Sequence, residues 1–353
     1  MAEPDAADRL ALDAAAEHAW QRLVVWGDDV RTLALAAHER WPDADIAMWN
    51  DWIGPEVPAV PALSPDSQAD LVLMRLPKAL DALLAWSGEV ARRFPDATLI
   101  AAGRIKHMTP AQNDVLAESY ENVRASLARQ KSRLLVASGA RAGAVSTAAE
   151  TRLDNAAGAA SGLSVVAVAG TFAGATLDIG TRALLDTLDV TLPDDGRGTV
   201  AFDLGCGSGL VAAWLARRGY RVRASDRSRA AVASTEATLH RNGYADRAEV
   251  VWEDALAGVE PGTAELIVLN PPFHEGTRVT VDPAHRLFAA AARSLAPGGE
   301  LIVVWNSHLR YRDHLDRLVG PTRQLERTPK FTVTTSRTPA KPDPNRLSSA
   351  GSP

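Results

Sequence analysis

The chain has 353 residues, a length that predicts about two domains. Its 46% hydrophobic and 23% charged residues are typical of a folded globular protein and exclude a disordered or fibrous one. The sequence has neither an apolar run of about 18 residues nor a basic and apolar leader, so we expect no membrane span and no secretory signal. The single cysteine, Cys206, excludes an intramolecular disulfide and favours a cytoplasmic protein. The eight histidines lack metal-ligand spacing, so we predict no metal.

Charge limits how the chain can meet nucleic acid. The net charge of −5 argues against a protein that coats RNA or DNA through bulk charge. Residues 1–137 hold 20 acidic and 14 basic side chains, whereas the remainder is nearly balanced. Any contact with nucleic acid is therefore expected to depend on a local surface rather than on the whole molecule.

Composition divides the chain into two folded blocks, residues 10–137 and 163–336. The stretch between them, 138–162, is dominated by Gly, Ala, Ser and Thr, which predicts a linker. The end, 337–353, is rich in Pro and Ser and predicts a disordered tail. Within both blocks short apolar runs alternate with amphipathic stretches, the pattern of an α/β fold with a mostly parallel sheet covered by helices.

The first block resembles a degenerate copy of the second. Its β-rich segments begin at Leu23, Asp45, Asp70, Thr98 and Gln130, and they parallel segments that begin at Val200, Arg221, Glu265, Glu300 and Thr328. In this pairing Asp51 matches Asp226, and Arg75 stands where the second block has Asn270. The order favours a duplication. Because the first copy lacks a glycine loop, we predict that it is catalytically silent.

The second block carries the elements that are expected to build a site. Strands are predicted at 199–203, 221–225, 248–252, 266–269 and 300–305, and helices at 209–218, 228–242 and 284–295. Gly219 and Gly243 stand where a helix ends in a left-handed residue, and Pro297-Gly298-Gly299 predicts a turn.

A glycine-rich loop follows the first of these strands. It reads Asp203-Leu-Gly205-Cys-Gly207-Ser-Gly209 and opens a helix, and a side chain at any of the three glycines is expected to block a ligand over the strand ends. The spacing is shorter than that of the dinucleotide fingerprint. Asp226 follows the second strand, where a carboxylate can accept both ribose hydroxyls. The loop therefore predicts a nucleoside site.

A double-proline turn, Asn270-Pro271-Pro272-Phe273, follows the strand at 266–269. Two prolines fix the backbone, so the turn can hold the Asn270 amide oxygen and the Pro271 carbonyl toward one point. Two fixed acceptors can bind the N–H groups of a planar exocyclic amine, which is catalysis by positioning without a strong base. Phe273 can stack on a flipped base.

These motifs resemble those of class I S-adenosylmethionine-dependent methyltransferases. Asp203 to Gly209 match the cofactor loop, Asp226 matches the ribose-binding acid, and Asp254, with Glu253 as the alternative, matches the acid near the adenine. The Asn-Pro-Pro-Phe turn resembles that of the methyltransferases that act on amino or amide nitrogen. The family fold has a seven-stranded sheet, with the cofactor over the carboxyl ends of its strands.

Further segments narrow the resemblance to the ribosomal RNA guanine-N2 methyltransferases. They are LDIGTRALL at 177–185, NPPFHEGTR at 270–278 and VVWNSHLRY at 303–311; KHMTPAQ at 106–112 favours the large-subunit type. The resemblance implies two tandem Rossmann-like methyltransferase domains, the N-terminal one degenerate, with S-adenosylmethionine as cofactor. It implies ribosomal RNA or a ribosomal subunit as partner. We expect a monomer.

Other residues and other functions stay open at this point. Pro272, His274, His308 and Lys330 are candidates for contact with the RNA substrate, although His274 could equally pack the turn and Lys330 could be an ordinary surface charge. One alternative is methyl transfer to another nitrogen, a glutamine amide in a translation factor or adenine N6. The other is a non-catalytic RNA-binding relative.

Overall fold

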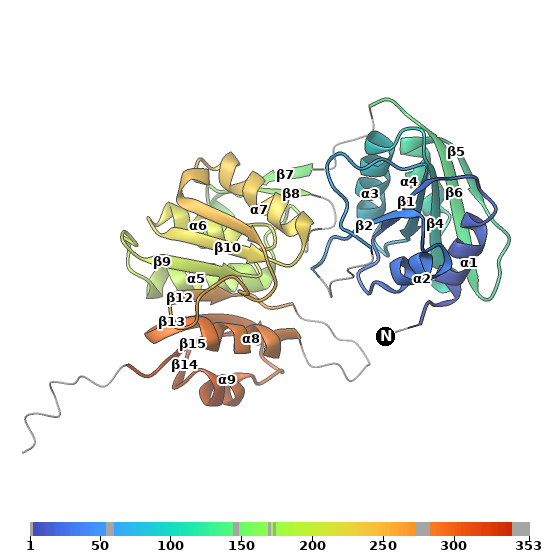
Figure 1. Ribbon diagram of the computed structural model, residues 1–353. Coiled ribbons are helices and arrows are strands. Elements are labelled where there is room, and N and C mark those ends of the chain that lie inside the picture. Colours follow the sequence, from blue (N-terminus) through green and yellow to red (C-terminus); the bar gives the residue numbers. More distant parts are fainter. Residues whose placement is uncertain are drawn as a thin grey trace, which may run out of the picture. The chain divides into compact units, whose positions relative to one another are not determined.

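The computed structural model describes residues 3–53, 60–143, 148–168, 171, 174–272 and 283–340. The chain divides near residue 148 into two compact units, each with helices on both faces of a central sheet (Figure 1). The predicted α/β class with two domains in tandem is confirmed. Among the residues described, no helix is long and apolar enough to cross a bilayer.

The first unit has a six-stranded sheet in the order β2-β1-β3-β4-β6-β5. Strands β2, β1, β3 and β4 are parallel, and β6 and β5 pair antiparallel at one edge of the sheet. Its elements are α1 (Ala6–Ala15), β1 (Arg22–Trp26), α2 (Thr32–Arg40), β2 (Asp45–Trp49), β3 (Leu71–Arg75), α3 (Leu80–Arg93), β4 (Thr98–Arg104), η1 (Ile105–His107), α4 (Ala111–Ser119), β5 (Tyr120–Ala125) and β6 (Ser132–Ala140).

The second unit has a seven-stranded mixed sheet in the order β11-β10-β9-β12-β13-β15-β14. A separate two-stranded sheet pairs β7 with β8. The elements are β7 (Ala148–Arg152), η2 (Asn155–Ala160), β8 (Ser164–Val168), α5 (Ile179–Thr191), β9 (Val200–Leu204), α6 (Leu210–Arg217), β10 (Arg221–Asp226), α7 (Arg229–Arg241), η3 (Ala245–Arg247), β11 (Ala248–Trp252), β12 (Ala264–Leu269), α8 (Pro283–Ser294), β13 (Leu295–Asn306), α9 (Arg312–Leu318), β14 (Thr322–Arg327) and β15 (Phe331–Arg337).

The strand orders agree with the duplication that the sequence predicts. With β1 matched to β9, β2 to β10, β3 to β12, β4 to β13, β5 to β14 and β6 to β15, the two orders are the same apart from β11. The second unit inserts α7, η3 and β11 between β10 and β12, whereas in the described part of the first unit β2 has an isolated parallel bridge from Met48 to Ala62 on its outer side and no further strand there.

Alternating side chains of each sheet bury two apolar layers, as expected of a sheet covered on both faces. In the first unit α1 and α2 pack on one face, and α3 and α4 pack on the other. In the second unit α5, α6 and α7 cover one face, and α8 and α9 cover the opposite one. The duplication therefore extends to the helices: α1 matches α5, α2 matches α6, α3 matches α8 and α4 matches α9.

Several boundaries differ from those expected. The first unit begins with α1, earlier than residue 10, and β6 runs to Ala140. The segment expected to be a linker, 138–162, contains β7 and η2 and contributes buried Leu153 and Ala160 to the core of the second unit. Gly298 has a positive φ of 79°, yet the predicted turn at 297–299 lies within β13. Of the expected tail, 337–340 is described and 341–353 lies outside the described residues.

The strand register corrects one detail of the repeat. Trp26 pairs with Trp49 in the first unit and Leu204 pairs with Ser225 in the second, so the residue that corresponds to Asp226 is Asn50. The sequence comparison was one residue out, at Asp51. Because side chains alternate along a strand, a shift of one residue exchanges the two faces of the sheet.

Candidate functional site

The glycine loop joins β9 to α6 at the carboxyl edge of the second sheet. Gly205, Gly207 and Gly209 have φ angles of 77°, 53° and 79°, which favour glycine. A Cβ at Gly205 or Gly207 would meet nothing within 4 Å, so these two positions border open space. A Cβ at Gly209 would lie 2.7 Å from the Thr235 Cα of α7. Gly209 therefore permits helix packing, which is a different reason from the one expected for it.

A hollow lies over this loop, and its wall includes residues from three parts of the second unit. The α5 region contributes Thr176, Asp178 and Thr181, and β12 is followed by Asn270; the loop and α6 contribute Asp203, Gly205, Cys206, Gly207, Ser208, Leu210 and Val211. The motifs that the sequence places at the ends of different strands thus meet at one point, as expected for the carboxyl edge of a parallel sheet.

Asp203 is the buried acid of the hollow. Only 2% of the residue is exposed, and its Oδ2 has no hydrogen-bond partner in the structure. Burial, reinforced by the nearby Asp226 carboxylate, raises the pKa of Asp203 to about 7. A buried carboxyl without a cationic partner, beside a hollow, fits a ligand that carries positive charge.

Asp226 braces the glycine loop from the end of β10. Its Oδ2 accepts a hydrogen bond from the Gly207 N–H at 3.1 Å, and its Oδ1 accepts one from the Ser228 N–H at 2.9 Å. The structure thus shows a bracing role for this residue in addition to the ligand role expected from the sequence.

The two acids after β11 have different surroundings. Glu253 is buried, accepts a hydrogen bond from the Gly258 N–H at 2.8 Å and lies 3.4 Å from Arg223. Asp254 forms an ion pair with Arg286 of α8 through Oδ2, while its Oδ1 is buried without a hydrogen-bond partner. Of the two, Asp254 retains an oxygen for a ligand, as the sequence-based assignment requires.

Asn270 follows β12 and lies in the wall of the hollow. Its Nδ2 donates to Thr181 Oγ1 at 3.0 Å, and its Oδ1 is buried without a hydrogen-bond partner. Pro271 is buried and Pro272 is exposed. An acceptor that is buried and unsatisfied is unfavourable, and a ligand N–H relieves this cost.

The remaining candidates lie away from the hollow or outside the description. His308 is exposed in the turn after β13, and Lys330 is exposed before β15. The Ser307 N–H donates to the Lys330 carbonyl at 2.9 Å, so the two candidates flank one turn-to-turn contact. Phe273 and His274 lie outside the described residues. Among the residues that are described, no group of three or more His, Cys, Asp or Glu is arranged to hold a metal.

Sequence reasoning gave Asp178 and Thr181 no individual role. Asp178 caps α5 by accepting the Gly180 and Thr181 N–H groups at 3.0 and 3.2 Å. An aspartate directly before an amphipathic stretch is a signal of a helix start. The contact between Thr181 and Asn270 joins residues 89 apart in the chain, so local pattern could not reveal it.

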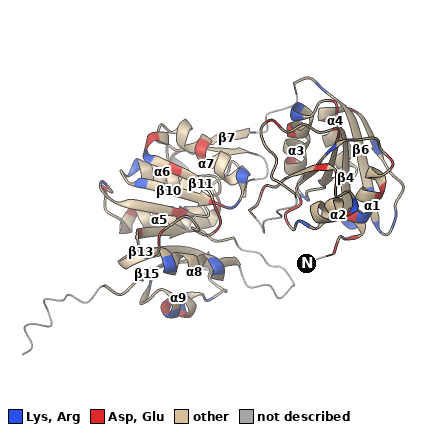
Figure 2. Ribbon diagram, in the orientation of Figure 1, with Lys and Arg blue, Asp and Glu red and all other residues tan. Residues whose placement is uncertain are grey.

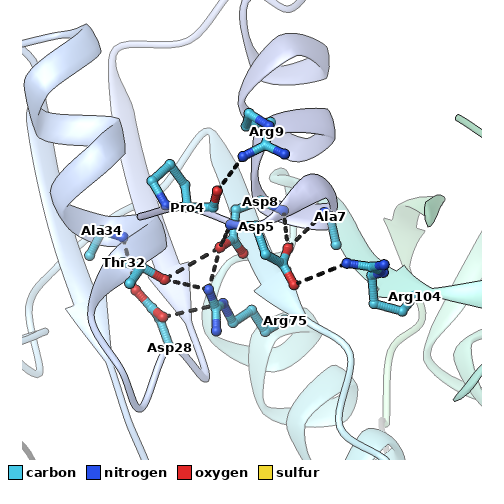
Figure 3. Close-up of polar contacts among 10 residues, drawn as sticks. All are labelled: Pro4, Asp5, Ala7, Asp8, Arg9, Asp28, Thr32, Ala34, Arg75 and Arg104. Carbon is cyan, nitrogen blue, oxygen red and sulfur yellow. Dashed lines mark hydrogen bonds and ion pairs between the residues drawn. The ribbon is translucent and has the colours of Figure 1, made fainter. Parts of the chain in front are cut away.

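The first unit has a charged cluster at the matching position (Figure 3). Trp26 pairs with Met74, as Leu204 pairs with Leu269, so Arg75 corresponds to Asn270. The Arg75 guanidinium makes ion pairs with Asp8 and Asp28, the latter at 3.2 Å, and donates to the Thr32 hydroxyl. Both aspartates are buried.

The loop of the first unit keeps the backbone of a glycine loop but not its open space. The Gly27 N–H donates to Trp49 O at 2.9 Å, as the Gly205 N–H donates to Ser225 O at 2.8 Å. A Cβ at Gly27 would lie only 2.4 Å from the Trp86 ring, so an indole covers this glycine. The space over Gly27 is thus filled by a protein side chain, whereas Gly205 and Gly207 border open space.

Comparisons with known proteins add independent information. The methyltransferase small domain family matches residues 162–335, and the RLMG N-terminal domain matches residues 50–141. The chain is 37% identical over 275 residues to Ribosomal RNA large subunit methyltransferase G of Streptomyces coelicolor, covering 76% of this chain and 72% of that protein. The protein of the same name from Pseudomonas putida (strain W619) is 38% identical over 291 residues, covering 80% and 74%.

A solved structure resembles both units together. It is the T. thermophilus 16S rRNA N2 guanine methyltransferase in complex with AdoMet and guanosine, with a TM-score of 0.75 and 21% identity over 95% of this chain and 92% of that chain. At this level of identity the likeness shows a shared tandem fold.

Proposed function

The chain belongs to the ribosomal RNA large subunit methyltransferase G family, and on that basis we propose that it transfers the methyl group of S-adenosylmethionine to the exocyclic N2 amine of a guanine in large-subunit ribosomal RNA. One observation carries the proposal. The Asn270 amide oxygen is a buried acceptor without a hydrogen-bond partner, in a hollow that the open glycines and the Asp203 carboxyl also border. The relatives named above are called ribosomal RNA methyltransferases, which supplies the substrate class.

The residues of the hollow fit the proposed cofactor. Open space at Gly205 and Gly207 allows a ligand to lie against the backbone, and Asp203 offers a buried carboxyl to its positive charge. Asp226 and Asp254 do not line the hollow itself; Asp226 is proposed to accept from the ribose hydroxyls, and Asp254, whose Oδ1 is buried without a hydrogen-bond partner, from the adenine amine. When bound, S-adenosylmethionine supplies the methyl group on a sulfonium that needs no further activation.

The protein is proposed to act by orienting the amine. Asn270 Oδ1 and the Pro271 carbonyl accept the two N–H groups of guanine N2, which directs the nitrogen lone pair toward the methyl carbon. The N2 proton leaves after transfer, when the nitrogen has become acidic, so no strong base is required. Phe273 is proposed to stack on the flipped guanine, with Pro272, His274 and His308 bordering it and Lys330 meeting a phosphate.

The mixed surface charge of the protein suits an RNA substrate that is bound through a few local contacts. Figure 2 shows Lys and Arg interspersed with Asp and Glu in both units. Phosphate contacts set the register of an RNA and carry no sequence information, so base contacts in the hollow must select the guanine. We further propose a monomer, because the described candidate residues all come from one unit of one chain. We also propose that it acts in the cytoplasm, which the single cysteine favours.

The test is methyl transfer from labelled S-adenosylmethionine to ribosomal RNA from a strain that lacks this gene. The labelled nucleoside is identified by mass, and the expected product is N2-methylguanosine. Asn270→Ala should lower the rate of labelling at least about 100-fold. Asn113→Ala is the matched control, since Asn113 is a partly buried residue of α4 in the first unit and its amide donates to Pro110 O at 3.1 Å.

Each other outcome contradicts part of the proposal. Label in a protein fraction alone moves the function to amide methylation, and label on adenine moves it to another base. No label in any fraction, despite cofactor binding, removes the enzyme claim and leaves a cofactor-binding relative.

A further inference from the structure

The orientation of the Asn270 amide decides whether the site works. An amide has an accepting end and a donating end, and the two ends differ only by a half-turn about the last side-chain bond. With Nδ2 on Thr181 Oγ1, the oxygen is the end left without a partner. In the reversed orientation the NH2 group would face the N–H donors of the substrate amine, and two sets of donors cannot bond to each other.

Thr181 is held firmly enough to choose between these orientations. Its N–H donates to the Asp178 carboxylate, which caps α5, and the next helical turns are anchored by buried Leu184, Leu185 and Leu188. A Cβ added at Gly180 would lie 3.1 Å from the Phe331 ring of β15, so the start of α5 is packed closely against the sheet. The hydroxyl is therefore presented from a fixed backbone.

The hydroxyl alone does not fix the direction of the bond, because a threonine hydroxyl can donate as well as accept. The corresponding pair in the first unit indicates the direction of this bond. Asp5 caps α1 as Asp178 caps α5, so Asp8, three residues later, corresponds to Thr181. Arg75 corresponds to Asn270, and the Arg75 guanidinium donates to the Asp8 carboxylate.

The chemistry of that pair allows only one direction. A guanidinium cannot accept a hydrogen bond, and an ionised carboxylate cannot donate one. In both units, therefore, the residue at or directly after the end of the third strand of the duplicated core donates, and the third residue of the first helix accepts. The same polarity has been kept while the residue types changed from an ion pair to a neutral pair.

We infer that Thr181 is a positioning residue for methyl transfer: its hydroxyl accepts the Asn270 Nδ2–H and so turns the amide oxygen toward the substrate amine. This inference rests on the proposed function for its effect on rate. It adds a residue that touches neither the reacting atoms nor, by this bond, the cofactor. It also explains why the second unit has the neutral pair of Thr181 and Asn270, because an Arg at position 270 would offer no acceptor to the substrate amine.

The first measurement compares Thr181→Val with Thr181→Ser. Valine keeps the shape and removes the acceptor, so kcat should fall about 10- to 100-fold while the Kd for S-adenosylmethionine changes less than about threefold. Serine restores the hydroxyl and should restore the rate. Thr187→Val is the matched control on the same helix, since the Thr187 hydroxyl bonds only to Ala183 O, one turn away, at 2.8 Å.

A double-mutant cycle separates positioning from a general structural role. If Thr181 acts through Asn270, Thr181→Val should change the rate less than about twofold in an Asn270→Ala background. Equal effects of Thr181→Val in both backgrounds would overturn the inference, as would a Thr181→Val enzyme with a kcat within twofold of the parent.

A spectroscopic measurement keeps the inference testable even where the proposed function fails. If the parent chain methylates no ribosomal RNA, the function is wrong, and the Asn270 side-chain amide is then followed by NMR in the full-length ¹⁵N-labelled protein. Loss of the acceptor should speed exchange of these protons with solvent in Thr181→Val and leave it unchanged in Thr187→Val. Unchanged exchange in Thr181→Val would show that the bond does not hold the amide, and would overturn the inference independently of any activity.

Discussion

The two units have the same backbone arrangement after their first strand but different surroundings of that loop. In each, the first strand ends at a glycine with positive φ, a short loop follows, and a helix begins after a residue in the left-handed conformation, Arg31 in one and Gly209 in the other. The first loop lies under Trp86 and contributes Asp28 to the ion pairs of Arg75; the second borders a hollow.

The comparison teaches that the fold does not require the open site. In the first unit the buried Asp28 Oδ1 and Arg75 Nε lack hydrogen bonds but form an ion pair at 3.2 Å, whereas in the second unit Asp203 Oδ2 and Asn270 Oδ1 have no hydrogen bond and no ion pair among the described residues. Unsatisfied buried polar groups are costly, and they persist where a ligand satisfies them. This difference favours the second unit as the one that binds a ligand.

The largest expected effect comes from installing the pair of the first unit in the second. The double variant Thr181→Asp with Asn270→Arg removes the acceptor oxygen and places a guanidinium in the hollow, where it opposes a cationic cofactor. Transfer should fall about 10³-fold or more, to the detection limit. The thermal midpoint should stay close to that of the parent, because the new pair makes the ion pair that Asp8 and Arg75 make.

The matched control for that variant is Asn113→Arg, which adds the same charge at a partly buried position of α4 in the first unit. Two results would break the comparison. Residual transfer above one per cent would show that the amide is not the acceptor, and loss of folding would show that the two positions are not equivalent.

The second prediction concerns the charged cluster itself. Arg75→Met leaves Asp8 and Asp28 buried without their cation, so we expect the first unit to lose about 3–5 kcal/mol of unfolding free energy, measured by urea denaturation. Arg40→Met is the control, since its pair with Asp13 is exposed on both sides and such pairs contribute about 0–1 kcal/mol.

The pH dependence of that loss has a definite sign. Burial raises the pKa of Asp28 even with Arg75 beside it, and removing the cation raises it further. A carboxyl whose pKa is raised on folding loses stability as the pH increases through that pKa. The deficit of Arg75→Met should therefore be smallest in acid and grow toward neutral pH; a deficit that shrinks as the pH rises would contradict the cluster's role.

Much of this architecture could be predicted from the sequence. Hydrophobic alternation located the strands of both units, and the order of five segments located the duplication, because strand pattern and turn chemistry are local. The five paired segments leave out DAADRLAL at 5–12 and DIGTRALL at 178–185, although both open with a capping aspartate and keep an arginine four residues later. The predicted first block consequently begins at residue 10, inside α1.

Contacts between distant residues could not be predicted in this way. The Thr181 bond to Asn270 and the role of Trp86 over Gly27 depend on register and packing across the sheet. The Asp51 assignment failed for the same reason: one residue of register is invisible in a five-residue strand but decides which side chain ends it. The structure places Asp203, Gly205, Gly207 and Asn270 in the wall of the hollow, and the sequence could indicate this because each lies at the end of a predicted strand or within four residues after it.

The third prediction uses the buried acid that has no counterpart among the ion pairs of the first unit. Since the pKa of Asp203 is raised to about 7, the carboxyl is largely neutral below that pH, and a cation binds its ionised form. Affinity for S-adenosylmethionine, measured by calorimetry, should rise up to tenfold per pH unit toward pH 7 and then level. Asp203→Asn should bind more weakly at pH 8 and lose this dependence.

The same group sets the sign of the pH effect on stability. Without cofactor, a folded-state pKa above the ordinary 3.8 means that the unfolding free energy falls as the pH rises from about 4 to about 7. Cofactor binding should reverse part of this fall. A pH-independent affinity in the parent chain would show that Asp203 does not meet the positive charge.

The smallest expected effects separate two glycines of one loop. Gly207→Ala places a methyl group in open space, so its fold should lose only the left-handed strain of about 1 kcal/mol, while cofactor affinity falls. Gly209→Ala adds a contact 2.7 Å from the Thr235 Cα to a similar strain, so thermal denaturation should show the larger loss of stability, about 2–3 kcal/mol.

The first unit shows why the same position there accepts a large side chain. Arg31 has a φ of 64° at the start of α2, but the described part of that unit has no helix between β2 and β3 to correspond to α7. The requirement for glycine at 209 thus follows from the inserted helix and not from the ligand. Gly209→Ala should therefore bind the cofactor with parent-like affinity at low temperature; a loss of affinity equal to that of Gly207→Ala would return Gly209 to the ligand site.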